Sequence, residues 1–160
     1  MSSPSNHVMG FHHVGVVVPD LELAISFYRE LLGFEVISES SWERDNLVFN
    51  QIVGLENSAA RFCMMQGNNS FIELFEYSEP AYVHHDDPGQ AFQPGYRHLS
   101  FAVTDVPAIL ERCIELGGRK INEPLRVPGR AAGVYCHDPF GNLLEFVQPM
   151  GNFPKPFHFD

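Results

Sequence analysis

Two segments follow the same plan and decide the fold: "HVGVVVPDLELAISFYRELLG" at residues 13–33 and "HLSFAVTDVPAILERCIELGG" at residues 98–118. In each, a histidine opens a short apolar run that predicts a strand, and an aspartate follows where a helix should begin. Asp20 and Asp105 suit the N-caps of these helices, and glycines end both of them. Such agreement between two distant segments indicates an internal duplication.

Three further strand-like stretches follow each predicted helix, so each half of the chain predicts a βαβββ module. They read "FEVISESSW", "ARFCMMQ" and "SFIELFEY" in the first half, and "RKINEPLRV", "GVYCHD" and "LLEFVQP" in the second. We therefore expect one α+β domain at 1–160, with a first module at 11–77, a linker at 78–95, a second module at 96–149 and a tail at 150–160. The stretch at 41–60 is longer than its counterpart and predicts an extra loop or turn.

Length and composition restrict the class of protein. The chain has 160 residues, of which 44% are hydrophobic and 19% charged, as in a globular domain. The net charge of -10 argues against nucleic acid or an anionic membrane as a partner. We expect no transmembrane span and no secretory signal, because no apolar run is long enough. Three widely spaced cysteines favour a reduced, cytoplasmic protein: Cys63, Cys113 and Cys136.

An acidic residue lies within an apolar run near the end of each module, Glu73 in "FIELFEY" and Glu145 in "NLLEFVQ". Burying a lone carboxylate costs several kcal/mol, so each glutamate needs a partner. If the strands of both modules curl into one sheet, His13 and His98 can converge with the two glutamates on its concave face. Each of the four side chains would then have polar partners that make its position in an apolar strand tolerable.

Two imidazoles and two carboxylates suit a divalent metal ion. One histidine at a strand start is more often structural, but two in register, each matched by a glutamate, favour the metal. No thiolate lies nearby, which favours Zn²⁺, Ni²⁺, Co²⁺, Mn²⁺ or Fe²⁺ with open positions for substrate over a structural zinc site. We expect His12 to face away from the site.

A second histidine pair, His84 and His85, stands beside Asp86 and Asp87 in the linker. This cluster mimics a metal site, but its Pro- and Gly-rich surroundings predict a loop. We do not expect it to bind metal.

The duplicated segments, together with "DPFGNLLEF" at 138–146, resemble the vicinal oxygen chelate superfamily. This superfamily includes glyoxalase I, methylmalonyl-CoA epimerase, extradiol dioxygenases and the fosfomycin and bleomycin resistance proteins. The resemblance covers roughly residues 11 to 149, and "DPFGNLLE" follows the DPxGxxxE signature. It implies paired βαβββ modules in a curved mixed sheet around a metal site, usually in a homodimer. The implied metal ligands are His13, Glu73, His98 and Glu145.

The complete ligand set is most similar to that of bacterial glyoxalase I and close to that of the epimerases. The resemblance implies a metal-stabilised enolate of a small carbonyl compound, with Glu145 as the first candidate for the proton-transferring base and Glu73 as the second. His98 lies 25 positions after Glu73 (98 − 73), closer to the epimerases, whose site forms within one chain, than to bacterial glyoxalase I, whose site is shared across a dimer. Sequence leaves these two arrangements open.

Two other functions remain open. A non-haem Fe²⁺ dioxygenase of the extradiol type would use His13, His98 and Glu145, although the acidic Glu73 counts against it. A protein that binds or sequesters a small hydrophobic compound without catalysis would need only an apolar pocket. The complete ligand set counts against this third function.

Candidate substrate contacts are less specific. Arg126 and Arg130 in "LRVPGRAAG" could close over an anionic group, or be ordinary solvated charges. Apolar and aromatic side chains could line a pocket, although core packing explains them equally well; they are Phe49, Met64, Phe101 and Tyr135.

Overall fold

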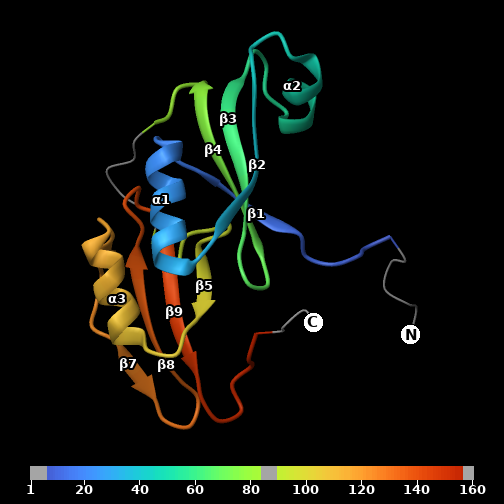
Figure 1. The fold of residues 1–160 in the computed structure, drawn as a ribbon. Coiled ribbons are helices and arrows are strands. Elements are labelled where there is room, and N and C mark those ends of the chain that lie inside the picture. The colour runs from blue at the N-terminus through green and yellow to red at the C-terminus, as the bar shows by residue number, and fades with distance from the viewer. Residues whose placement is uncertain (1–6, 84–89, 157–160) are drawn as a thin grey trace.

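The computed structural model describes residues 7–83 and 90–156 and shows the duplication directly (Figure 1). The first module contains β1 (His13–Val17), α1 (Leu21–Leu32), β2 (Glu35–Trp42), α2 (Leu47–Val53), β3 (Ala59–Gln66) and β4 (Phe71–Glu79). The second contains β5 (His98–Ala102), α3 (Val106–Glu115), β6 (Arg119–Lys120), β7 (Leu125–Val127), β8 (Ala131–His137) and β9 (Leu143–Pro149). The expected α+β class is confirmed.

Each module forms its own sheet. The strand order is β1-β4-β3-β2 in the first and β5-β9-β8-β6 in the second, with β7 also paired to β8. The leading strands β1 and β5 pair in parallel with β4 and β9, and each lies at an edge of its sheet. The single curved sheet expected from the sequence is therefore not formed within one chain, because these two edge strands do not pair with each other in the described residues.

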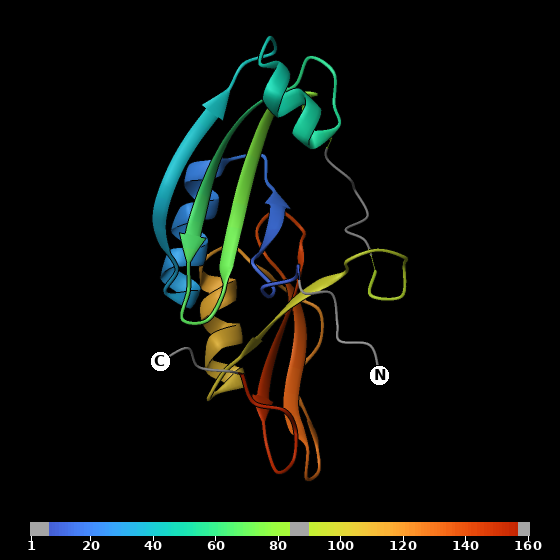
Figure 2. The same ribbon diagram turned by 90° about the vertical axis from the view of Figure 1, so that its right-hand side faces the viewer.

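The modules join through their helical sides instead. Helices α1 and α3 contact each other on the same side of both sheets, and α3 lies below α1 in Figures 1 and 2. The buried Tyr28 hydroxyl of α1 donates a hydrogen bond to Asp138, 3.0 Å away in the second module. Phe34 and Phe101 meet edge to face, with ring centroids 6.2 Å apart. These contacts merge the two helix-covered faces into one core.

Strand alternation leaves the other face of each sheet open. On β4, Ile72 and Leu74 are buried, whereas the intervening Glu73 is only partly buried. On β9, Leu144 and Phe146 are fully buried, whereas Glu145 is again partly exposed. Because side chains alternate between the faces of a sheet, the two glutamates belong to the faces that the helices do not cover.

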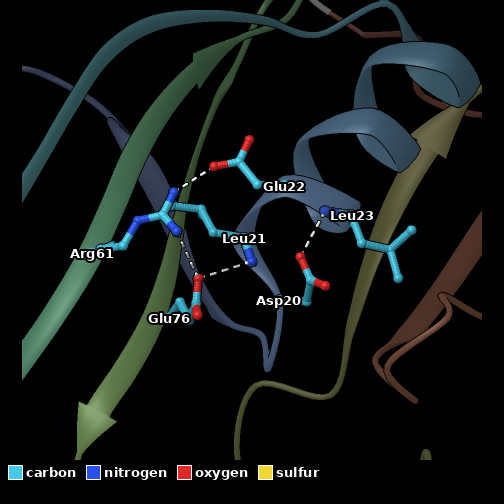
Figure 3. A network of polar contacts seen from close by, with 6 residues as sticks. All are labelled: Asp20, Leu21, Glu22, Leu23, Arg61 and Glu76. Atoms are coloured by element: carbon cyan, nitrogen blue, oxygen red, sulfur yellow. Dashed lines mark hydrogen bonds and ion pairs between the residues drawn. The ribbon is translucent and has the colours of Figure 1, made fainter.

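Both long helices begin where the sequence predicts. The Asp20 side chain accepts a hydrogen bond from the Leu23 amide at 2.9 Å, and α1 ends at Gly33 in the left-handed conformation. In α3, Asp105 accepts from the Ala108 amide at 3.0 Å. An unpredicted contact attaches the start of α1 to its sheet. Figure 3 shows Glu76 of β4 accepting from the Leu21 amide at 3.1 Å and facing the Arg61 guanidinium, which also pairs with Glu22.

The long stretch at 41–60 contains the short helix α2 rather than only a loop. Asn46 caps it by accepting from the Phe49 amide at 3.1 Å. Beside this helix, the indole nitrogen of Trp42 donates a hydrogen bond to the hydroxyl of Ser58 at 3.0 Å. The Ser58 hydroxyl in turn donates a hydrogen bond to Asn50 Oδ1 on the helix. The second module has no helix at this place, so this insertion distinguishes the two modules.

The remaining expectations concern the linker, the tail and the cysteines. The cluster of His84, His85, Asp86 and Asp87 lies outside the described residues. The start of the tail is attached to the second module, since the Met150 amide donates to the Arg130 carbonyl at 2.7 Å. All three cysteines are free and buried. No helix in the described parts of the chain has the length and apolar character needed to cross a membrane.

Candidate metal centre

The first histidine–glutamate pair lies on the open face of the first sheet. His13 Nε2 is 3.1 Å from Glu73 Oε2, and the side chains are 36% and 16% exposed. The register of β1 and β4 places Gly15 opposite Glu73. Neighbouring residues of a sheet in register point to the same face, so His13, two positions before Gly15, shares the face of Glu73.

The second pair repeats this geometry. His98 Nε2 is 3.3 Å from Glu145 Oε2, with side chains 34% and 26% exposed. In the pairing of β5 and β9, Ser100 stands opposite Glu145, so the residue two positions after the histidine again faces the glutamate. The duplication thus extends to the relative positions of the donor atoms.

The two pairs do not meet within one chain. In the described residues, no group of three or more histidine, cysteine, aspartate or glutamate side chains gathers where it could hold a metal. The four ligands that the sequence predicts are instead divided two and two. The physical reason is that the modules join through α1 and α3, which leaves each open face with half of the donor set.

His12 is closer to the site than strand alternation predicted. Its Nδ1 lies 2.7 Å from the Nδ1 of His13, and its ring stacks on Phe71 with centroids 5.5 Å apart. One of these nitrogens must donate and the other accept, so the contact fixes the His13 ring with Nε2 toward Glu73. The alternation of strand side chains does not apply to His12, because it precedes the first residue of β1. The adjacency of His12 and His13 in the sequence was the signal that could have indicated their contact.

The residue before His98 is Arg97, whose Nε is buried and has no hydrogen-bond partner among the described residues. His98 instead contacts Tyr135, with ring centroids 5.0 Å apart and planes at 77°. Tyr135 pairs with Glu145 across β8 and β9. Burial, and to a lesser extent the charge of Glu145, raise the pKa of Tyr135, so its hydroxyl keeps its proton at neutral pH.

The second open face contains a cavity of about 380 Å³ that includes Glu145, Tyr135 and Arg130. Arg130 lies over the ring of Phe153 from the tail, 5.9 Å from its centroid. Arg126 is exposed and is not among the residues that line this cavity. Of the two arginines suggested by the sequence, only Arg130 is therefore beside a predicted ligand.

The apolar candidates are likewise separated. Met64 stands opposite Glu73 in the pairing of β3 and β4, so it shares the open face. Phe49 of α2 stacks on Trp42 at the end of the same sheet, with centroids 4.9 Å apart. Phe101 lies on the helix side of β5 and packs against the core. Phe101 is an odd number of positions after His98 on β5, so strand alternation places the two side chains on opposite faces of the sheet.

The aspartate of the "DPFGN" segment has a structural role that the sequence did not reveal. Asp138 is fully buried and accepts hydrogen bonds from the amides of Phe140 and Asn142, from the Asn142 side chain and from Tyr28. Burial nonetheless raises its pKa, against the lowering effect of these bonds. Asp138 thus shapes the turn before the strand of Glu145 and ties it to the first module.

The model of the Glyoxalase/Bleomycin resistance protein/Dioxygenase superfamily matches residues 10–146, nearly the whole chain. The chain belongs to this superfamily. The match includes both histidine–glutamate pairs, so the duplicated modules are those of the glyoxalase fold.

Individual members of this superfamily are similar to the chain in sequence or in fold. A 2-epi-5-epi-valiolone epimerase of Actinomyces sp. is 31% identical over 143 residues, covering 85% of this chain and 77% of the relative. A glyoxalase family protein of Bacillus cereus has a TM-score of 0.82 at 22% identity, covering 94% of this chain and all of the other. A fosfomycin resistance protein of Listeria monocytogenes, solved with Mn(II) and a dihydroxypropylphosphonic acid, has a TM-score of 0.55 at 21% identity, covering 89% and 94%.

Proposed function

We propose that the chain is a metal-dependent enzyme of glyoxalase or epimerase type, which moves a proton next to a carbonyl group of a small substrate. The observation that carries this proposal is the repeated pair: His13 with Glu73 and His98 with Glu145, at the same register on two open faces. A merely structural role would not require the same two donors, a histidine and a glutamate, at matching positions in both modules.

We infer further that a homodimer completes the site. Within residues 7–83 and 90–156, no strand pairs with the outer edge of β1 or of β5, and such edges favour pairing with another strand. A groove of about 1010 Å³ runs beside β5 and includes Ser100 and Ala102 of that strand. If β1 of one copy lies beside β5 of another, twofold symmetry creates two equal sites, each with a histidine–glutamate pair from both copies.

The donor chemistry fits a divalent ion. Two neutral imidazoles and two carboxylates balance the charge of Zn²⁺, Ni²⁺, Co²⁺, Mn²⁺ or Fe²⁺. His13, Glu73, His98 and Glu145 would hold it, and the Listeria relative with Mn(II) supports such use of this fold. When bound, the ion would act as a Lewis acid that stabilises negative charge developing on a substrate oxygen.

Glu145 is our first candidate for the base. Its side chain opens into the cavity that contains Tyr135 and Arg130, and a Cβ added at Gly133 would lie 4.0 Å from Glu145 Oε1. The missing side chain at Gly133 therefore leaves room beside that oxygen. Glu145 would take the proton from the carbon next to the carbonyl, and Glu73 from the opposite module would return it.

The contact between His13 and Glu73 favours this function over the extradiol dioxygenase. A two-histidine, one-glutamate site would use His13, His98 and Glu145 alone. Glu73 Oε2 lies as near to its histidine as Glu145 Oε2 lies to His98. This similar spacing supports our inclusion of Glu73 beside Glu145 in the proposed donor set.

Metal analysis of protein purified without chelator, followed by Glu145→Gln, tests the proposal. The amide oxygen of glutamine can still contact the metal but cannot accept the proton. We expect retained metal, and exchange of the substrate's α-proton with deuterated solvent slowed by about 100-fold or more. Exposed Glu115→Gln on α3 is the matched control. Protein that binds no divalent metal, or undiminished exchange in Glu145→Gln, would contradict the proposal.

A further inference from the structure

We propose that Arg130 binds a carboxylate of the substrate in the cavity beside Glu145, so that the substrate is a carbonyl compound with a short apolar segment that ends in a carboxylate. This inference rests on the proposed function and specifies its substrate class. The cavity measures about 380 Å³ and includes Glu145, Tyr135 and Arg130 on the open face of the second sheet. We call it the second-module cavity. Its volume is typical of sites for small molecules.

Small side chains create the second-module cavity. Gly133 and Val147 pair across β8 and β9, and both line the cavity. Phe62 and Phe75 pair at the equivalent position of the first sheet, where their rings stack with centroids 5.6 Å apart. Aromatic rings therefore occupy the open face of the first module at the place where the second module leaves room for a ligand.

Apolar side chains form much of the wall of this cavity. They come from the strands β7, β8 and β9 and from the tail, and include Leu125, Val127, Ala131, Val147 and Phe153. Burial of apolar surface favours a hydrocarbon segment against such a wall. Because Glu145 and Arg130 line the same cavity, one small molecule can reach both. A substrate that presents its reacting carbon to Glu145 can therefore extend its apolar segment along the wall and place its end at Arg130.

The positive charge of Arg130 is not balanced by a carboxylate. Its guanidinium lies over the Phe153 ring, and no described acidic side chain forms an ion pair with it. Glu123, which also lines the cavity, pairs with Lys120 instead. Other arginines of the chain do pair with glutamates; they are Arg29, Arg44, Arg61 and Arg112. Arg130 is exposed, so a ligand can reach its guanidinium from solvent.

The backbone of Arg130 holds the hairpin and the start of the tail. Its amide donates to the Val127 carbonyl at 3.1 Å, and its carbonyl accepts from the Met150 amide at 2.7 Å. Neither hydrogen bond uses the side chain. A variant that lacks the guanidinium should therefore keep both, so the contribution of its charge to ligand binding can be measured in a folded protein.

The chemistry of a guanidinium selects the kind of group that would bind. A guanidinium can donate two parallel hydrogen bonds to the two oxygens of a carboxylate. One guanidinium also balances one negative charge, which favours a carboxylate over a doubly charged phosphate. The chain carries a net charge of -10, which disfavours anions in general. An acid should therefore bind better than its neutral amide only where a local positive charge compensates.

Acid and amide pairs test this inference. The monohydroxamates of succinic, glutaric, adipic and pimelic acid each carry a metal-binding hydroxamate at one end and a carboxylate at the other. The corresponding primary amides share the hydroxamate and the chain but lack the charge. Dissociation constants of each pair are measured by calorimetry on Zn²⁺-loaded full-length protein. We expect the acid to bind at least about tenfold more tightly than its amide at one or more chain lengths, because a charge-assisted hydrogen bond replaces a neutral one.

Arg130→Gln should reduce this preference for the acid to about twofold or less. Arg126→Gln is the matched control, because it removes the same charge from the same hairpin but lies outside the cavity lining, and it should keep the preference. If Arg130→Gln does not fold, Arg130→Met takes its place. Equal affinities of acid and amide at every chain length, an unchanged preference in the Arg130 variant, or an equal loss in the Arg126 variant would overturn the inference.

Filling the cavity gives a second test. Val147→Phe places in the second module the residue that the first has at the equivalent position, Phe75. It should weaken binding of acid and amide alike by about tenfold while the affinity for Zn²⁺ is kept. Exposed Val48→Phe on α2 is the control and should bind both as the unchanged protein does. Undiminished binding of both compounds by Val147→Phe would place the ligand outside this cavity and overturn the inference.

These measurements separate the inference from the proposed function. If the protein binds metal and Glu145→Gln slows proton exchange, but acids and amides bind equally, only the carboxylate site fails. If the protein binds no divalent metal, the proposed function fails. Hexanoate and hexanamide, which need no metal, then test the carboxylate site on the metal-free protein. A preference for hexanoate that Arg130→Gln removes and Arg126→Gln keeps supports that site, and equal binding of the two compounds overturns it.

Discussion

The two modules share their donor pairs but differ in what surrounds them. In the first, Glu73 is followed along its strand by Phe75 and Tyr77. In the second, Glu145 opens toward a cavity that contains Tyr135 and Arg130. The duplicated modules have kept the positions of the histidine and glutamate side chains, while the remainder of each open face has diverged. We infer that both modules contribute equally to metal binding and unequally to substrate binding.

Removal of either histidine tests whether both modules contribute equally to metal binding, and it should lower metal affinity more than any other change proposed below. His13→Ala and His98→Ala each remove one of four proposed ligands, so both should lower metal affinity by more than the roughly 10–100-fold that outer partners contribute. Competition with a chromogenic chelator measures it. A large loss of metal affinity in one variant, with unchanged affinity in the other, would show that the two histidine–glutamate pairs do not contribute equally.

The residues that precede the two histidines, His12 and Arg97, differ between the modules. His12 contacts His13, whereas Arg97 Nε makes no hydrogen bond in the described residues. We expect His12→Ala to lower metal affinity by about tenfold, because partners of a ligating imidazole fix its orientation. Arg97→Ala, assayed by the same chelator competition, should lower it less. The reverse order would contradict the orienting role of His12.

The contact between the modules can be weakened on its own. Tyr28→Phe removes the hydroxyl that donates to buried Asp138, so we expect a loss of about 1–3 kcal/mol in the free energy of unfolding. Urea denaturation measures this loss, with fully exposed Tyr96→Phe as the control. Equal stabilities of the two variants would show that this hydrogen bond does not stabilise the arrangement of the modules.

The smallest effect concerns pH. Burial raises the pKa of Asp138 in the folded protein, so the folded state holds its proton more tightly than the unfolded chain does. Its contribution to stability is therefore largest below the ordinary aspartate pKa of about 4 and decreases as the pH rises through the raised value. Carboxyl carbon shifts in an NMR titration would assign this pKa. An Asp138 that titrates below the ordinary value would reverse the expected sign.

Local signals explain which features the sequence could predict. The caps Asp20 and Asp105 act on amides three residues away, so their helices were predictable. The positions of the histidines and glutamates within each module followed from the duplication. The packing of α1 on α3 depends on contacts such as Tyr28 with Asp138, which are 110 residues apart. No local pattern reveals such a contact, so the division of the ligands between two faces could not be predicted.

We propose that the two half-sites meet between copies of the chain. The decisive test is a heterodimer of one His13→Ala chain and one His98→Ala chain, purified through two different tags. In a shared site, His98 and Glu145 of the first chain join His13 and Glu73 of the second, so the heterodimer should bind a single metal ion tightly while both variant homodimers bind metal far more weakly. If the heterodimer binds no more metal than the homodimers do, the sites do not form between chains.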